Sequence, residues 1–197
     1  MKDAMTQKQK TVPDFWKQVM DPQTISRSIS RISYEILEKD ADLSKLALVG
    51  IRTGGEYIGK RIQEKIESIE NAKVAFGVID ITLYRDDLSH SSSQPILKGT
   101  DLPFPISGSR IVLVDDVLYT GRTIRAALDA IVDFGRPSRV ELACLVDRGH
   151  REVPIRPDYV GKNLPTSRNE FVRVRLSEMD YVDGVYMISE EFGEKGN

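Results

Sequence analysis

Two adjacent carboxylates, Asp115 and Asp116, follow a run of apolar residues in segment 112–123, VLVDDVLYTGRT. Neighbouring carboxylates at the end of a buried strand repel each other and resist desolvation, so their position needs a chemical reason. Carboxylates accept hydrogen bonds from vicinal hydroxyl groups, and they attract Mg²⁺ together with its bound water. The pair therefore indicates a site for a sugar and a hydrated magnesium ion.

The second half of the same segment has the composition of a phosphate cradle. Where a strand leads through a loop into a helix, backbone N–H groups and the helix dipole favour a phosphate. Gly121 allows close approach of the backbone, Thr120 and Thr123 add hydroxyl donors, and Arg122 adds a charged donor. No Lys follows the glycine, so the segment is not a P-loop. A ribose 5-phosphate fits both halves; the alternative is an acidic helix start followed by an exposed loop.

Apolar runs predict the strands that would position these residues. We expect strands at residues 46–51, 73–84, 110–116 and 139–147, and two more within 170–188, separated by SEMD. Because strands alternate with helices, the pattern favours an α/β fold with a mainly parallel twisted sheet flanked by helices. Ligands of such sheets bind at the carboxyl ends of the strands. The loops after Ile51, Val114 and Val146 should therefore meet at one edge.

The spacing of apolar residues predicts three helices. The first begins at an N-cap at Thr24, the second follows the glycines after residue 53, and the third runs over 121–134 and ends at Gly135. Their apolar stripes are formed by Ile25, Ile29, Ile32 and Ile36, by Ile58, Ile62, Ile66 and Ile69, and by Ile124, Leu128, Ile131 and Phe134.

Composition limits the class of protein. The 197 residues are 40% hydrophobic and 29% charged, which suits one domain with its own core. The formal charge of -2 means that an anionic partner must meet a local basic patch. The single cysteine, Cys144, excludes a disulfide framework and favours a reducing cytoplasm, and no apolar run is long enough to imply a membrane partner. We expect residues 1–22 to be a mobile extension and residues 23–197 a single domain.

Several motifs together resemble one family. The combination of DD and TGRT resembles the signature of type I phosphoribosyltransferases for phosphoribosyl pyrophosphate (PRPP), although many members have Gly in place of Arg122. GIRTGGEYIGKRI, DITLYRDDL, DDVLYTGRT, VDRGHREVPIRPDYVGKN and PTS together resemble the PyrR family of pyrimidine-operon attenuation regulators with uracil phosphoribosyltransferase activity. The resemblance extends from about Ile25 to the last predicted strands. It implies a type I phosphoribosyltransferase fold with a flexible hood loop at LYRDDLS.

The resemblance also implies a reaction, in which uracil and PRPP give UMP and pyrophosphate. Its transition state should resemble a ribosyl oxocarbenium ion. Asp115 and Asp116 would hold the ribose hydroxyls and support the developing positive charge. Arg85 would contact pyrophosphate once the hood loop closes and excludes water. Mg²⁺ bound with PRPP, rather than by direct protein ligands, would neutralise the leaving group.

The implied substrate contacts come from three loops. Several relatives have Arg at the position of Gly54, and this departure is expected to weaken pyrophosphate binding unless Arg52 compensates. For Arg52 the alternative is an ordinary surface charge. Asp147 and Arg148 would lie near the base or the pyrophosphate. The full implied set is Arg52, Thr53, Gly54, Val117, Leu118, Tyr119, Thr120, Gly121, Arg122, Thr123, Asp147 and Arg148.

One face of the first predicted helix suggests a second partner. At 100° per residue, Arg27, Ser30, Arg31 and Tyr34 lie opposite the isoleucine stripe. A solvated basic face is the ordinary explanation, but the resemblance implies contacts with an RNA hairpin of the pyr mRNA leader. Some relatives have His in place of Tyr34, which could still stack on an unpaired base. Further RNA-side positions implied by the resemblance are Thr53, His150, Arg151, Arg156 and Lys162.

Three functions stay open at this point. The protein could be a bifunctional uracil phosphoribosyltransferase and RNA attenuator that responds to UMP or UTP. It could be the enzyme without RNA regulation, for which Tyr34 and Gly54 are small hints. It could also be a regulator that senses uridine nucleotides with negligible catalysis. The resemblance implies a homodimer or a larger homo-oligomer.

Overall fold

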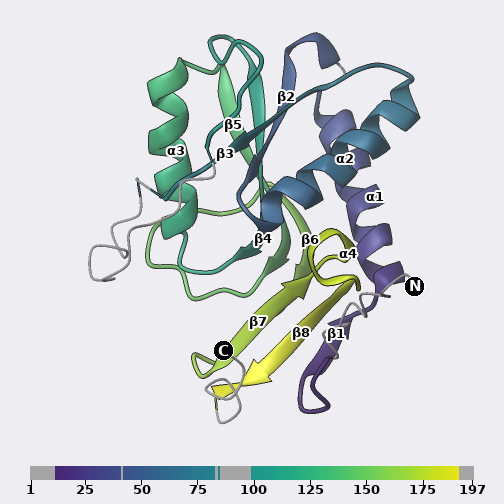
Figure 1. Cartoon of the computed structure of the whole chain (residues 1–197). Coiled ribbons are helices and arrows are strands. Elements are labelled where there is room, and N and C mark those ends of the chain that lie inside the picture. Colours follow the sequence, from purple (N-terminus) through teal and green to yellow (C-terminus); the bar gives the residue numbers. More distant parts are fainter. Residues whose placement is uncertain (1–11, 41, 83, 85–98, 191–197) are drawn as a thin grey trace, which may run out of the picture.

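The computed structural model describes residues 12–40, 42–82, 84 and 99–190 (Figure 1). The predicted hood loop, with Arg85, lies outside the described residues apart from Tyr84. None of the described helices is long and apolar enough to cross a membrane.

A five-stranded sheet forms the centre of the molecule. Its strands are β2 (Leu46–Ile51), β3 (Ala75–Ile79), β4 (Arg110–Leu118), β5 (Arg139–Asp147) and β6 (Tyr159–Asn163). They lie in the order β3-β2-β4-β5-β6, and every pairing is parallel. This confirms the predicted α/β fold with a mainly parallel sheet.

Three details of this sheet differ from the prediction. β3 stops at Ile79 because the Asp80 carboxylate accepts hydrogen bonds from the amide and hydroxyl of Thr82 and turns the chain. β4 continues to Leu118, two residues beyond the predicted end, so the paired carboxylates lie inside the strand and not at its end. β6 was not predicted, because prolines precede it and only Tyr159 and Val160 of its five residues are apolar.

Helices cover both faces of the sheet (Figure 1). α1 (Pro22–Lys39) and α2 (Gly54–Glu70) pack on one face, where their isoleucines meet alternate residues of β2 and β4. α3 (Arg122–Phe134) packs on the other face. A short 3-10 helix (Leu43–Lys45) leads into β2. The alternation of side chains along the strands thus divides the core into two layers.

Two predicted helix details are wrong. The N-cap of α1 is Asp21 and not Thr24, because the Asp21 carboxylate accepts a 2.7 Å hydrogen bond from the Thr24 amide. Phe134 is 52% exposed, because small alanines, and not Phe134, complete the buried face of α3.

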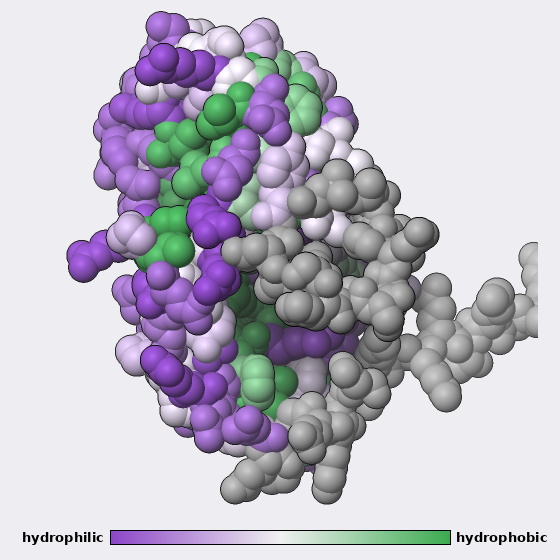
Figure 2. Space-filling view, turned by 90° about the vertical axis from the view of Figure 1, so that its left-hand side faces the viewer, coloured by the Kyte–Doolittle hydropathy of each residue, from purple (hydrophilic) through white to green (hydrophobic). Residues whose placement is uncertain are grey.

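Figure 2, viewed from the α3 side, shows hydrophobic residues gathered in the upper half of a mainly hydrophilic surface. The exposed hydrophobic residues of α3 include Val132 as well as Phe134.

A second, antiparallel sheet lies below the first in Figure 1 and has the order β1-β8-β7. β7 (Glu170–Arg175) and β8 (Gly184–Ser189) were predicted, and the intervening SEMD forms the short helix α4 (Ser177–Asp180). β1 (Lys17–Met20) pairs with β8, and Met20 is 1% exposed. The prediction that residues 1–22 are a mobile extension is therefore wrong for residues 17–20.

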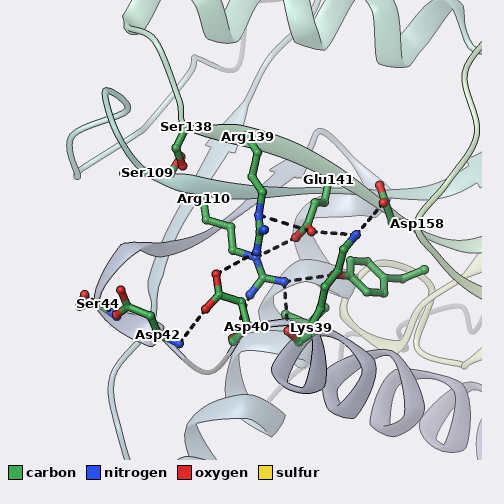
Figure 3. A network of polar contacts seen from close by, with 12 residues as sticks. Lys39, Asp40, Asp42, Ser44, Ser109, Arg110, Ser138, Arg139, Glu141 and Asp158 are labelled. Carbon is green, nitrogen blue, oxygen red and sulfur yellow. Dashed lines mark hydrogen bonds and ion pairs between the residues drawn. The ribbon is translucent and has the colours of Figure 1, made fainter.

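A buried ion pair joins the amino ends of the central strands (Figure 3). Arg110 Nε lies 2.8 Å from Glu141 Oε2, and the two side chains are 3% and 4% exposed. Arg110 also donates to the Ile36 carbonyl and the Tyr159 hydroxyl, while Lys39 Nζ lies 2.9 Å from Glu141 Oε1. Burial alone would raise the pKa of Glu141, but hydrogen bonds from Lys39 and Arg110 hold this pKa below its ordinary value. These contacts tie the end of α1 to β4, β5 and β6.

Candidate active site

The two carboxylates of β4 line a cavity of about 460 Å³ at the carboxyl end of the sheet. Asp115 is 6% exposed, and Asp116 is half-buried. The Asp115 carboxylate accepts a 2.9 Å hydrogen bond from the Asp116 amide, and the Asp116 carboxylate accepts one of 2.9 Å from the Val117 amide. Neighbouring side chains on a strand point in opposite directions, and each carboxylate has a local donor. These two features explain how the strand accommodates adjacent negative charges.

A second cavity of about 370 Å³ adjoins the first, around the start of α3. Gly121 precedes this helix with φ +90°, and the amide of Arg122, its first residue, donates to the Thr120 hydroxyl at 3.4 Å. The start of a helix, with its N–H groups and dipole, favours an anion in this cavity. A Cβ at Gly121 would lie 2.6 Å from Val153 Cγ2, so both the conformation and the packing require glycine. The residues lining this cavity include Val117, Leu118, Tyr119, Thr120, Gly121, Arg122 and Thr123.

The predicted phosphate donor Arg122 has a partner that the sequence did not indicate. Its Nε lies 2.6 Å from Glu152 Oε2, and both side chains are about half exposed at 46% and 50%. Glu152 lines the same cavity, and its amide donates to the Thr120 carbonyl. A bound phosphate would therefore compete with Glu152 for Arg122.

The loop between β2 and α2 brings Arg52, Thr53 and Gly54 to the carboxylate cavity. Arg52 Nη1 lies 3.1 Å from Glu56 Oε2, and Arg52 Nε donates to the Gly99 carbonyl. A Cβ at Gly54 would lie 2.3 Å from Asp116 Oδ2. Gly54 is thus the point at which the start of α2 touches a carboxylate of the site. In the sequence, the need for glycine at position 54 is visible only as the doublet Gly54-Gly55.

The loop after β5 is held against residues 119–121, the predicted phosphate loop. Arg151 Nη2 lies 2.6 Å from Asp147 Oδ2, and Nη1 donates to the Tyr119 carbonyl at 2.8 Å. The Arg151 guanidinium also donates to the Ile155 carbonyl, and the side chain is 20% exposed. Arg151 was predicted as an RNA contact; in the structure its hydrogen bonds join the loop after β5 to the Tyr119 carbonyl.

Arg148 and His150 both contact the Tyr119 ring. Arg148 is 5% exposed, its guanidinium carbon lies 4.1 Å from the centroid of the Tyr119 ring, and it donates to the Glu170 carbonyl. The His150 ring meets the Tyr119 ring edge-on, and its Nε2 lies 2.6 Å from the Thr166 carbonyl oxygen. These contacts place both residues beside the phosphate loop.

The other residues that were predicted to contact RNA lie partly on α1 and partly on other elements. Arg27 is exposed, Ser30 is half-buried and Tyr34 is 48% exposed on α1. Arg31 Nη2 donates to the Val160 and Gly161 carbonyls of β6 at 2.8 Å each, while its side chain stays 50% exposed. β6 also carries Lys162, which by strand alternation lies on the same face of the sheet as Val160, opposite the face that α1 covers. The structure leaves Arg156 exposed before β6 and Thr53 exposed beside the first cavity.

The small sheet contributes a wall that was not predicted from the sequence. Val172, Arg173 and Val174 of β7, with Met179 and Asp180 of α4, line the carboxylate cavity. The sequence indicated strands here, but it gave no signal that they face Asp115 and Asp116. The contact depends on how one sheet folds against the other.

Comparisons with known proteins agree with this geometry. The model of the phosphoribosyl transferase domain matches residues 16–178. The bifunctional protein PyrR of Clostridioides difficile is 58% identical over 168 residues, covering 85% of this chain and 95% of that protein. The one from Acetivibrio thermocellus is 56% identical, covering 91% and 96%.

Solved structures share the fold at low sequence identity. A hypoxanthine phosphoribosyl transferase of Trypanosoma cruzi has a TM-score of 0.72 at 20% identity and covers 94% of this chain and 97% of its own. A hypoxanthine-guanine phosphoribosyltransferase of Bacillus anthracis has a TM-score of 0.68 at 16% identity, covering 89% and 99%. The predicted type I phosphoribosyltransferase fold is thus confirmed.

Proposed function

The chain belongs to the phosphoribosyltransferase family and, within it, to the PyrR proteins, and from this premise we propose a bifunctional role. One activity joins uracil to the ribose phosphate of PRPP and yields UMP and pyrophosphate. The other binds the leader of pyr mRNA in response to uridine nucleotides and so controls transcription attenuation.

The observation that carries the enzymatic proposal is the shared wall of the two cavities. Asp115, Val117 and Thr123 line both the phosphate cavity and the carboxylate cavity. A ligand with its ribose at this wall would extend a 5-phosphate toward the start of α3. It would extend its other end toward the loop of Arg52 and Gly54. PRPP has this shape, with a phosphate on one side of the ribose and pyrophosphate on the other.

The proposed chemistry uses the carboxylates as charge stabilisers. As the bond from C1 to pyrophosphate breaks and the bond from C1 to uracil N1 forms, N1 loses its proton and the ribosyl group gains positive charge. Asp115 and Asp116 would bind the 2- and 3-hydroxyls and face this charge. Arg52 and Arg85 would contact the departing pyrophosphate, and Arg148 would fix Tyr119 beside the phosphate loop.

The site fits magnesium that arrives with the substrate. Among the residues that the structure describes, no group of three His, Cys, Asp or Glu could hold a metal ion. The two carboxylates of β4 could bind water of a hydrated ion whose main ligands are the oxygens of PRPP. Mg²⁺ held in this way would neutralise the leaving pyrophosphate.

The regulatory proposal rests on the exposed face of α1. Arg27 and Arg31 place positive charge there in a chain whose formal charge is -2. Tyr34 offers an exposed ring beside them for stacking on an unpaired base. We further propose a homodimer or larger homo-oligomer in the cytoplasm, the compartment that the single cysteine favours.

Both activities can be tested on one preparation. UMP formation from uracil and PRPP is measured with and without Mg²⁺, and binding of a pyr leader hairpin is measured at low salt with and without UMP. We expect Mg²⁺-dependent turnover and tighter RNA binding with UMP. Turnover without RNA binding would support an enzyme without regulation, and RNA binding without turnover would support a nucleotide sensor.

A further inference from the structure

Arg61 joins α2 to the small sheet through two carboxylates. Its Nε and Nη2 donate to the two oxygens of Glu178 at 2.8 and 2.6 Å. Its Nη1 and Nη2 donate to the two oxygens of Asp183 at 2.8 Å each, and Nη2 also donates to the Ser177 hydroxyl at 3.0 Å. Such two-point contacts fix direction as well as distance.

The cluster is partly withdrawn from water and keeps its charges. The Arg61 and Asp183 side chains are each 19% exposed, and Glu178 is 34% exposed. Hydrogen bonds from Arg61 lower the pKa of Glu178. Burial alone would raise the pKa of Asp183, but hydrogen bonds from Arg61 and the Ser177 amide hold this pKa below its ordinary value. Without Arg61, two close carboxylates would repel each other.

The element that Arg61 holds is also a wall of the carboxylate cavity. α4 comprises four residues, of which Ser177 and Glu178 contact Arg61, while Met179 and Asp180 line the cavity. A helix of this length is not stable alone, so its position depends on its anchors. Further anchors are Arg175, whose Nη2 donates to the Asp180 carbonyl at 3.3 Å, and Met179, which packs against the core.

We propose that Arg61 is a positioning residue for the phosphoribosyl transfer reaction. Through Glu178 and Asp183 it fixes how far the α4 wall stands from Asp115 and Asp116, and it does not itself touch substrate. The inference rests on the proposed function. The apolar face of α2, formed by Ile58, Ile62 and Ile66, is fully buried without help from Arg61, so loss of the guanidinium should disturb the wall and not the fold.

The test compares Arg61→Met, Arg61→Lys and a matched control, Arg139→Met. Arg139 is also ion-paired to carboxylates, but at the amino ends of the strands. We expect Arg61→Met to raise KM for PRPP and uracil about tenfold, or about 1.4 kcal/mol, with a smaller change in kcat. Lys keeps the charge without the planar fork, so Arg61→Lys should recover part of the loss. Arg139→Met should keep wild-type KM values.

Two further readouts separate the inference from the proposed function. UMP affinity, measured by calorimetry, should fall in Arg61→Met even if the wild type forms no UMP from uracil and PRPP. Amide hydrogen exchange at Met179, Asp180 and Tyr181 should accelerate in Arg61→Met and less in Arg61→Lys. If Arg61→Met does not fold, the Glu178→Gln/Asp183→Asn double variant replaces it, with the same expected loss. Wild-type KM, UMP affinity and exchange in the folded variants would overturn the proposal.

Discussion

The contact between Gly54 and Asp116 makes a sharp prediction for Gly54→Ala. The added Cβ would lie 2.3 Å from Asp116 Oδ2 and 2.5 Å from Cγ, whereas ordinary contact begins at 3.4 Å. The carboxylate must therefore move by about 1.1 Å, and a misplacement of about 1 Å in a catalytic constellation costs about 100-fold in rate. We expect kcat/KM for UMP formation to fall about 100-fold, or about 2.7 kcal/mol of transition-state stabilisation.

The loss in activity should exceed the loss in stability. Overpacking costs roughly 1–3 kcal/mol, and the preference of a helix for alanine over glycine, about 1 kcal/mol in a helix interior, offsets part of it, so the free energy of unfolding should fall by no more than about 2 kcal/mol. Gly59→Ala is the matched control, because Gly59 lies on the same helix and its added Cβ would meet Phe76 and not Asp116. This control should keep wild-type kcat/KM.

A double-mutant cycle tests the assigned cause. In an Asp116→Ala background the two closest atoms, Oδ2 and Cγ, are absent and only Cβ remains, 2.9 Å from the added methyl group, so Gly54→Ala should have a smaller further effect. If Gly54→Ala alone keeps wild-type kcat/KM, or if the two substitutions are additive, displacement of the carboxylate is not the mechanism.

Three further predictions concern charged contacts. Glu152→Gln should lower KM for PRPP several-fold, because Arg122 loses its competing partner, and should change unfolding free energy by less than about 1 kcal/mol; a raised KM would contradict this. Glu141→Gln leaves Arg110 with an uncompensated buried charge, so urea denaturation should show a loss of about 3–5 kcal/mol with kcat retained. Because the folded pKa of Glu141 is lowered, its stabilising contribution is present above the ordinary pKa and lost as pH falls; the variant should therefore show weaker acid dependence of stability. Arg27→Gln should weaken RNA hairpin binding. It should also reduce the slope of the logarithm of the binding constant against the logarithm of salt concentration by about 1, and an unchanged slope would place Arg27 outside the interface.

Local patterns predicted most of the central fold. The strand and glycine turn of 112–123 and the isoleucine stripes of α1 and α2 depend on neighbours in sequence, and these predictions are confirmed. The N-cap of α1 was misjudged because Asp21 and Thr24 are both good capping residues, and Pro22 places the helix start after Asp21. Strand β1 was missed because its partner, β8, lies at the opposite end of the chain.

The site was predictable where it follows one segment and not where distant segments meet. The sequence indicated cations at Arg122 and Arg151, but it could not show that Glu152 forms an ion pair with Arg122. Nor could it show that the N–H groups of Arg151 donate to backbone carbonyls and to Asp147. Likewise, the contact between Gly54 and Asp116 depends on β2 and β4 lying side by side.

The buried pair of Arg110 and Glu141 has a consequence for protein engineering. It joins the strands at their amino ends, while the loops that line the carboxylate cavity leave the same strands at their carboxyl ends. Substitutions in those loops should therefore lower the free energy of unfolding only a little. The domain can thus serve as a scaffold for engineering altered base selectivity. A designer would keep Arg110, Glu141 and Lys39 unchanged and diversify the opposite rim.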